Sequence, residues 1–220
     1  MRVLFVAATP FEVKSLKSAL LNLPPTGSEL STNKFKLIIS GVGMVATAYT
    51  LGKELSINKY DLAVNLGIAG SFDRTIPLGD IVEIIEDNLA ELGAEDDENF
   101  LSISQLGFGE SLFNATANII DFTQTPHVKK ATAITVNTVH GNEASISKLQ
   151  QRHNVGIESM EGAAFFYACR EANVPCMQIR AISNYVEKRN RSNWQIGLAI
   201  KNLNDFAISL LNKLNSKDGN

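Results

Sequence analysis

Two glutamates stand at positions where a carboxylate could do chemistry. Glu12 follows an apolar run that ends at Thr9, and Glu161 begins the otherwise apolar segment 161–165. An acid near the start of a helix is stabilised by the helix dipole, and this alone would explain both residues. A partly buried acid nevertheless usually has a partner, and a carboxylate can accept two hydrogen bonds from a sugar diol. Glu161 is therefore a candidate binding residue, whereas Glu12 taken alone is typical of a first helical turn.

Small residues and a carboxamide follow three other apolar runs. These segments are Gly41-Val42-Gly43, Gly67-Ile68-Ala69-Gly70 and Ser183-Asn184-Tyr185. In an open α/β sheet, ligands bind at the carboxyl ends of the strands. We therefore expect these segments to meet the two glutamates at one edge of a sheet. A plain strand-to-helix turn also explains the first segment, although glycine lets backbone amides approach a ligand closely.

Missing motifs exclude several other chemistries. The sequence has no nucleophile elbow in a Ser/His/Asp order, no P-loop and no G-x-G-x-x-G motif. His127, His140 and His153 show no metal-ligand spacing, and neither do Cys169 and Cys176. We predict no metal, no cofactor and a reduced pair of thiols in a cytoplasmic protein.

Composition and charge narrow the class of protein. The chain has 220 residues, of which 45% are hydrophobic and 20% charged, as in a folded domain rather than a disordered chain. No stretch approaches the roughly 18 uninterrupted apolar residues of a membrane helix. The net charge is −3, whereas proteins that bind nucleic acids usually carry a basic excess. We expect neither nucleic acid nor membrane as a partner, and we interpret the basic cluster Lys188, Arg189 and Arg191 as a solvated loop.

The apolar pattern predicts alternating strands and helices. We expect strands at 3–8, 35–40, 61–66, 81–85, 131–136, 155–157 and 176–182, and helices at 13–21, 45–55, 144–151, 162–172 and 194–214. This order indicates one α/β domain over residues 1–220, since no repeat or linker divides the chain. Residues 87–113 are expected to form a surface insertion with little regular structure. Their acidic run, Glu95-Asp96-Asp97-Glu98, is expected to be solvated rather than to bind a cation.

Six segments, in this order, resemble one enzyme superfamily. They are Ala7–Glu12, Ser40–Gly43, Asn65–Ser71, Leu78–Val82, Met160–Ala164 and Ile182–Asn184. Together they resemble the nucleoside phosphorylase/hydrolase superfamily, and most closely the branch that holds methylthioadenosine/S-adenosylhomocysteine nucleosidases and futalosine hydrolases. The resemblance extends over nearly the whole chain. Each segment alone is a weak signal, and the order in which they occur makes the set specific.

The resemblance implies a fold and a role for each site residue. The fold is a single three-layer α/β domain with a mixed central sheet flanked by helices, assembled as a homodimer or larger homo-oligomer. The reaction is cleavage of the N-ribosidic bond of a purine nucleoside by water. In the implied roles, Glu12 activates the water, Glu161 holds the ribose hydroxyls, Met160 packs against the sugar, the turn Ile68-Ala69-Gly70 lines the reacting centre, and the backbone of Val139 faces the base. These roles agree with the chemistry, because an anion near the sugar stabilises an oxocarbenium-like transition state and a positioned base takes the proton of the water.

Asn184 departs from the nucleosidases of that branch, which carry Asp after the serine that corresponds to Ser183. A protonated Asp can donate to N7 of the purine, and the carboxyl group can accept from a 6-amino group. A carboxamide can donate N–H to N7 and O6 but is a poor acid. We therefore assign Asn184, with Ser183 beside it, to the leaving base and expect a hypoxanthine nucleoside. The resemblance implies hydrolysis of futalosine, which releases hypoxanthine in menaquinone synthesis.

Three other functions stay open. An adenine-type nucleosidase would act on methylthioadenosine, S-adenosylhomocysteine or aminodeoxyfutalosine. A phosphorylase would need cations or hydroxyls around phosphate near Gly41 and Ile68, where the nearest cation along the chain is Arg74. A nucleoside-binding protein without activity could share the scaffold, although the presence of both glutamates argues against it.

The partner of the nucleoside's 5′ substituent is the last open question. A substituent that bears a benzoate would need an aromatic wall and a cation. The candidates are Phe100, Phe108, Phe113, Tyr185, Lys188, Arg189 and Arg191. Core packing is the ordinary explanation for the aromatic residues among them.

Overall fold

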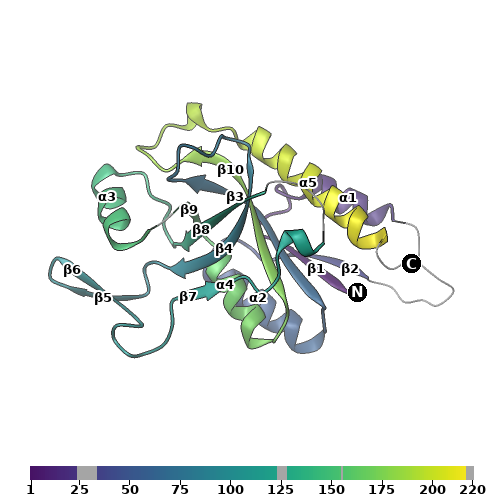
Figure 1. The fold of residues 1–220 in the computed structure, drawn as a ribbon, viewed down its shortest axis with the longest axis horizontal. Coiled ribbons are helices and arrows are strands. Elements are labelled where there is room, and N and C mark those ends of the chain that lie inside the picture. Colours follow the sequence, from purple (N-terminus) through teal and green to yellow (C-terminus); the bar gives the residue numbers. More distant parts are fainter. Residues whose placement is uncertain (24–33, 123–127, 155, 217–220) are drawn as a thin grey trace.

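The computed structural model describes residues 1–23, 34–122, 128–154 and 156–216 (Figure 1). His127 and the first residue of the strand expected at 155–157 lie outside the described residues. The strands are β1 (Val3–Ala7), β2 (Phe35–Ile39), β3 (Leu62–Ser71), β4 (Ile81–Leu89), β5 (Gly93–Asp96), β6 (Asn99–Ser102), β7 (Leu112–Asn114), β8 (Lys129–Thr135), β9 (Ile157–Ser159) and β10 (Cys176–Tyr185). The helices are α1 (Lys14–Leu21), α2 (Met44–Ile57), α3 (Glu143–Arg152), α4 (Gly162–Glu171) and α5 (Ile196–Ser216), with short 3₁₀ helices η1 (Ile119–Asp121) and η2 (Arg191–Asn193).

The described strands form a mixed sheet, as the resemblance implied. Eight of them pair in the order β10-β4-β8-β9-β3-β1-β2, with β7 on β4, while β5 and β6 form a separate hairpin. β3 is parallel to β1 and β10 but antiparallel to β9. Because β10 pairs with both β4 and β3, the strands β10, β4, β8, β9 and β3 form a closed ring of pairings. The carboxyl ends of β3 and β10 consequently lie side by side at one edge.

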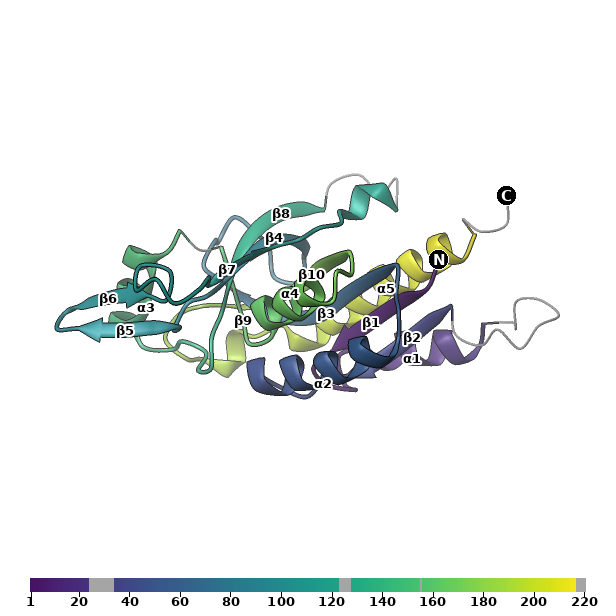
Figure 2. The ribbon, with the colours of Figure 1, turned by 90° about the horizontal axis from the view of Figure 1, so that it is seen from below.

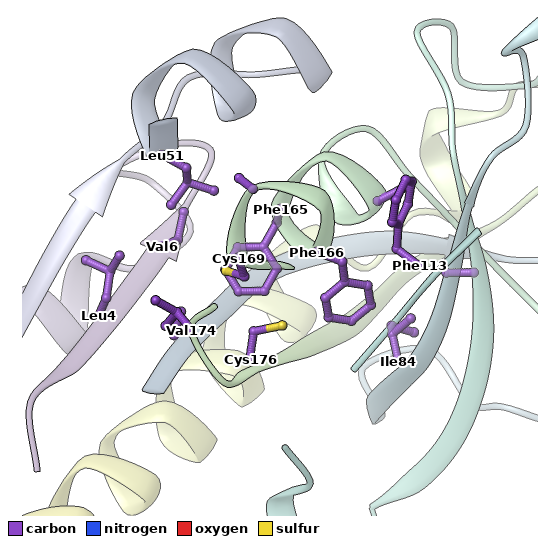
Figure 3. Close-up of a cluster of buried hydrophobic side chains, with 14 of the residues drawn as sticks. Leu4, Val6, Leu51, Ile84, Phe113, Phe165, Phe166, Cys169, Val174 and Cys176 are labelled. Carbon is purple, nitrogen blue, oxygen red and sulfur yellow. The ribbon is translucent and has the colours of Figure 1, made fainter. Parts of the chain in front are cut away.

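Helices cover both faces of the sheet and make the predicted three layers. α2 and α4 lie against one face, and α1 and α5 against the other (Figures 1 and 2). The pattern of β1 explains this arrangement, because successive side chains of a strand point to opposite faces. Leu4 and Val6 pack with Leu51 and Phe165 in the core on the first face (Figure 3), whereas Phe5 belongs to the core on the second. A strand buried on both faces therefore has the uninterrupted apolar sequence seen at the start of this chain.

β3 and β10 extend beyond their predicted ends, and the predicted turn at Ile68-Ala69-Gly70 is wrong. These residues lie inside β3, which continues to Ser71, and β10 continues to Tyr185. The backbone of β10 pairs with β3 along its whole length, and β9 pairs with Gly70 and Ser71. Ladder hydrogen bonds thus hold the glycine-containing stretch extended. A Cβ on Gly70 would lie 2.9 Å from a methyl group of Val186, so close packing accounts for glycine there.

Residues 87–113 contain more regular structure than expected. They include the end of β4, the β5–β6 hairpin and most of β7, so the prediction of little regular structure is wrong. The hairpin projects from the end of the molecule opposite to the N-terminus (Figure 2). Its acidic run, at the end of β5 and in the turn, is exposed as predicted. Phe113, in contrast, is buried in the core because β7 pairs with β4. Short strands of this kind are missed because a hairpin that lies away from the core lacks the apolar alternation used to find strands.

The other predicted strands and helices are confirmed, with ends shifted by a few residues. Cys169 and Cys176 are free and buried among apolar side chains of the first core (Figure 3). Among the described helices, none is long and apolar enough to cross a membrane. The described residues also contain no cluster of three or more His, Cys, Asp or Glu side chains that could hold a metal ion.

Candidate active site

One cavity of about 310 Å³ lies at the edge where the carboxyl ends of β3 and β10 meet. The residues predicted for the site all line it: Glu12, Ile68, Ala69, Gly70, Val139, Met160, Glu161, Ser183 and Asn184. They come from the loop after β1, from β3 and β10, from the loop after β8 and from the junction of β9 and α4. The sheet pairings therefore bring together segments that are far apart in the sequence.

Glu12 is held by hydrogen bonds that fix both of its carboxylate oxygens. Oε2 accepts from the backbone N–H of Thr9 at 3.0 Å and from its hydroxyl at 2.9 Å, and Oε1 accepts from the N–H of Ile68 at 3.1 Å. α1 begins only at Lys14, so Glu12 precedes the helix and is not an acid of its first turn. The bond to Ile68 ties the loop after β1 to β3, so this carboxylate is positioned by the sheet.

Glu161 has the partner that its burial requires. It immediately precedes α4, and its Oε1 accepts a hydrogen bond from the backbone N–H of Gly43 at 2.9 Å. Gly43 has a φ of 91°, a left-handed conformation that glycine adopts readily, and it precedes α2. Burial raises the pKa of Glu161, while Arg180 and the Gly43 N–H counteract the shift. Glu161 therefore joins the start of α4 to the start of α2 at the wall of the cavity.

Arg180 is a buried cation that the sequence analysis did not select. Its side chain is 1% exposed, and Nη2 donates to Oδ1 of Asn65 at 2.5 Å. The guanidinium lies over Gly67, where a Cβ would come within 2.3 Å of Nη1 and 3.2 Å of Glu12 Oε1. Burial lowers the pKa of Arg180, and the charges of Glu161, Asp87 and Glu12 raise it again. Arg180 is thus the counter-charge that the carboxylates of the site share.

A buried polar cluster supports the start of α4 behind the cavity. Asp87 accepts hydrogen bonds from the Thr135 hydroxyl at 2.8 Å and from Nε2 of Gln178 at 3.0 Å. Thr135 Oγ1 in turn accepts from the N–H of Ala163 at 2.8 Å. A Cβ on Gly162 would lie 2.0 Å from Oδ2 of Asp87, so only glycine fits beside this cluster. Burial raises the pKa of Asp87 to about 6.

Asn184 and Ser183 lie where β10 carries a bulge. The pairing of β10 with β3 shifts register between Ile182 and Asn184. The Ser183 hydroxyl lies 3.1 Å from the Ala69 carbonyl and 2.8 Å from Oδ1 of Asn184, and it can donate to one of these oxygens at a time. Nδ2 of Asn184 donates to the Tyr185 carbonyl at 3.0 Å. Since an amide nitrogen has two N–H groups, one stays available for a ligand.

His140 and Glu158 form a pair that also lines the cavity. The backbone N–H of His140 donates to Oε1 of Glu158 at 2.9 Å, and Nδ1 of the imidazole contacts Oε2. Burial raises the pKa of Glu158, and the bonds from His140 counteract the shift. β9 holds Glu158 in place by pairing with β3 and β8. The pair fixes the loop that carries Val139, and no spacing in the sequence indicated it.

Several residues that were candidates for binding the 5′ substituent or phosphate do not line the cavity. Phe113 lines a separate hollow, and the Tyr185 hydroxyl donates to the carbonyl of Ile76 at 3.2 Å. Arg74, the nearest cation in the sequence for binding phosphate, pairs with Glu187. Of the basic cluster, Arg189 lines the cavity, whereas Lys188 and Arg191 do not.

Comparisons with known proteins identify the superfamily of this chain. The family model described as "Phosphorylase superfamily" matches residues 2–214, so the chain belongs to this superfamily. Among relatives, the futalosine hydrolase of Streptomyces coelicolor is 33% identical over 187 residues, which cover 82% of this chain and 80% of that protein. The 5′-methylthioadenosine/S-adenosylhomocysteine nucleosidase of Psychromonas ingrahamii is 28% identical over 246 residues, with 98% of this chain and 100% of that protein covered.

Solved structures show the same fold. The 5′-methylthioadenosine/S-adenosylhomocysteine nucleosidase of Colwellia psychrerythraea, in complex with adenine, superimposes with a TM-score of 0.78 at 23% identity, covering 97% of this chain and 96% of that one. The corresponding enzyme of Neisseria meningitidis, in complex with methylthio-immucillin-A, gives a TM-score of 0.77 at 17% identity, covering 95% and 97% of the two chains. The single mixed α/β domain is therefore shared with these nucleosidases.

Asp87 predicts a specific dependence of stability on pH. Its pKa is raised from 3.8 to about 6 in the folded protein, so the stability it contributes is complete below about pH 4 and is lost as the pH rises through 6. Asp87→Asn removes this titration. The new amide N–H of residue 87 can donate to Oε1 of Gln178, which has no hydrogen-bond partner among the described residues of the wild type, once the Gln178 amide turns over. We expect the free energy of unfolding of the variant, relative to wild type, to increase by up to about 3 kcal/mol between pH 4 and pH 7. Chemical denaturation across this range measures it, and a difference that stays constant with pH would contradict the assignment.

Proposed function

We propose that this protein is a futalosine hydrolase, a cytoplasmic enzyme of menaquinone synthesis that uses water to release hypoxanthine from futalosine. The observation that carries the proposal is that Glu12, Glu161 and Asn184 line one cavity. The futalosine hydrolases of three bacteria, at 27% to 33% identity, support the choice of substrate. The free, buried Cys169 and Cys176 are consistent with a reducing compartment.

In this mechanism the two glutamates act on the ribose. Glu161 accepts hydrogen bonds from the 2′- and 3′-hydroxyls, with Met160 packed against the sugar. Breaking the N-ribosidic bond builds positive charge on the ribose, and the nearby carboxylates stabilise it. Glu12 takes a proton from the water that attacks C1′. The bonds from Thr9 and Ile68 hold Glu12 in the orientation that this step needs.

The amide of Asn184 binds the departing base. One N–H of its Nδ2 donates to N7 or O6 of hypoxanthine, and Ser183 orients the carboxamide through Oδ1. The backbone of Val139 faces the other edge of the base. Ala69 and Gly70, at the end of β3, line the reacting centre with Ile68, so that strand positions the ribose below the base.

Water, rather than phosphate, is the acceptor in this proposal. Phosphate needs cations or an array of donors around it. Among the residues that line the cavity, Arg189 is the one Lys or Arg, and the loop after β2 contributes the apolar Val42. Arg180 lies behind the wall, shared by the carboxylates, and Arg74 is paired with Glu187. These observations favour hydrolysis over phosphorolysis.

An adenine-type nucleosidase is the second candidate. The relation to the Psychromonas ingrahamii nucleosidase, which extends over 98% of this chain, favours it. Its substrate would be methylthioadenosine, S-adenosylhomocysteine or aminodeoxyfutalosine. Asn184 is the residue that separates the two candidates, because a carboxamide is a poor acid for a 6-aminopurine.

We also propose that the enzyme is a homodimer or larger homo-oligomer. Val45 and Tyr49, one helical turn apart on α2, are 81% and 73% exposed, and Val42 beside the cavity is also exposed. Exposed apolar side chains that lie close together are typical of an interface. Sedimentation velocity should give at least twice the monomer mass, and Val45→Asp should shift it toward the monomer. A monomeric wild type would contradict this assembly.

Hydrolysis predicts which products form and that phosphate is not needed. The purified protein should release hypoxanthine from futalosine in a buffer without phosphate, at a rate that added phosphate leaves unchanged. Chromatography of the reaction measures both the base and the sugar product. Strict dependence on phosphate, with a ribose 1-phosphate as product, would overturn hydrolysis.

Glu12→Gln tests the general base. The amide keeps the size of the side chain but cannot take a proton, so we expect kcat for futalosine to fall about 10² to 10⁴-fold while the protein stays folded. Glu143→Gln, at the exposed start of α3, is the matched control and should keep wild-type kcat. Turnover of Glu12→Gln close to wild type would remove the role proposed for Glu12.

Asn184→Asp tests the specificity for the base. A carboxyl group that can be protonated should shift kcat/KM toward 6-aminopurine nucleosides relative to 6-oxopurine nucleosides. Inosine and adenosine, measured side by side in both proteins, give this ratio. If the ratio is the same in wild type and variant, Asn184 does not select the 6-substituent.

A further inference from the structure

Arg189 is a cation at the cavity that has no ionic partner in the described part of the chain. It lines the cavity, and no ion pair among the described residues involves it. Other cations of the surface do have such partners, as Arg74 has in Glu187 and Lys129 has in Asp73. The guanidinium of Arg189 instead lies over the ring of Trp194, 4.9 Å from its centroid. A guanidinium in this arrangement keeps its donors available for an anion.

The loop that carries Arg189 is fixed at both ends. It joins β10 to α5 (Figure 1), and Val186 N–H donates to the Ser71 carbonyl while Gln195 N–H donates to the Ser183 carbonyl, each at 2.8 Å. Within the loop, the Asn190 side chain accepts from the backbone of Ser192 at 3.1 Å and begins η2. The loop therefore holds Arg189 and Trp194 beside the strand end that carries Asn184.

A second contact places Arg189 against the loop after β8. A Cβ on Gly141 would lie 3.4 Å from Cβ of Arg189, so the loop after β8 packs directly on the arginine. The wall around it is apolar and aromatic, because Phe11, Trp194 and Ile196 also line the cavity. Phe11 is 69% exposed although it is an aromatic residue. An aromatic side chain left in solvent at the mouth of a cavity is available to pack against a ligand.

The charges inside the cavity determine which end an anion can occupy. Glu12, Glu158 and Glu161 line the inner part and are all buried, so they repel a negatively charged group there. Arg189 is exposed and stands at the outer end. The cavity is thus polarised, with carboxylates for the sugar inside and one cation outside.

We propose that Arg189, Trp194 and Phe11 form a subsite for an aromatic carboxylate carried on the 5′ side of the nucleoside. This inference rests on the proposed function and deepens it. The guanidinium pairs with the carboxylate, and the aryl ring packs against Trp194 and Phe11. Futalosine carries a benzoate on this side and methylthioadenosine a methylthio group, so the subsite selects the first class of substrate. Phe100, Phe108 and Phe113 have no part in it, because they do not line the cavity.

Binding can be measured without any turnover, because Trp194 is the single tryptophan of the chain. Titration with 3-acetylbenzoate should change the intrinsic fluorescence in a saturable way. The uncharged 3-acetylbenzamide should bind at least tenfold more weakly, and Arg189→Gln should abolish this difference. Arg191→Gln is the matched control: its guanidinium lies 5.8 Å from the same ring but does not line the cavity. Equal affinities for the acid and the amide in wild type would overturn the subsite.

Kinetics separate a failure of the subsite from a failure of the proposed function. In Arg189→Gln, the ratio of kcat/KM for futalosine to kcat/KM for inosine, which lacks the substituent, should fall about tenfold or more, and in Arg191→Gln it should keep its wild-type value. An unchanged ratio in Arg189→Gln would overturn the subsite while leaving hydrolysis intact. If wild type cleaves neither nucleoside, the proposed function fails, and the fluorescence titration still decides whether the aryl carboxylate binds.

Discussion

The burial of one guanidinium among three carboxylates is the constraint on which the rest of the site depends. Arg180 is inaccessible to solvent, and the charges of Glu161, Asp87 and Glu12 act on it from different elements. A buried charge without a counter-charge is costly, so the charge of Arg180 and those of the three carboxylates stabilise one another. The acids outnumber the cation, which leaves this part of the site negative when the carboxyl groups are ionised.

The ring of strand pairings fixes where these charged groups and Asn184 lie. β10 carries Arg180 and Asn184, its neighbour β3 carries the N–H that binds Glu12, and β9 leads directly to Glu161. Because β3 pairs with both β9 and β10, the three segments cannot separate without breaking the sheet. The start of α4 is fixed in the same way by the cluster of Asp87 and Thr135. The pairings that make the fold therefore also position the residues of the cavity, and the fold itself is shared with solved nucleosidases.

Local patterns predicted most of the fold, and the resemblance to a known superfamily supplied most residues of the cavity, but neither indicated how those residues are held. A continuous apolar run locates β1, and the periodic spacing of apolar residues locates the helices, because burial of these side chains determines both patterns. The ends of β3 and β10 were missed because pairing between distant strands keeps the glycines and Asn184 extended. Arg180 follows Gln178 by two residues in an apolar strand, so both point to one side, and this polar alternation could have indicated a buried polar cluster. The pairing of His140 with Glu158 depends on tertiary contact and has no local signal.

The central claim is that two acids and one amide close on the same nucleoside. A crystal structure of the protein with hypoxanthine bound tests it most directly. The account predicts hypoxanthine in the cavity between Val139 and Asn184, with Nδ2 of Asn184 within hydrogen-bond distance of N7 or O6 and with space for a ribose beside Glu12 and Glu161. Hypoxanthine bound outside this cavity, or inside it without contact to Asn184, would contradict the account.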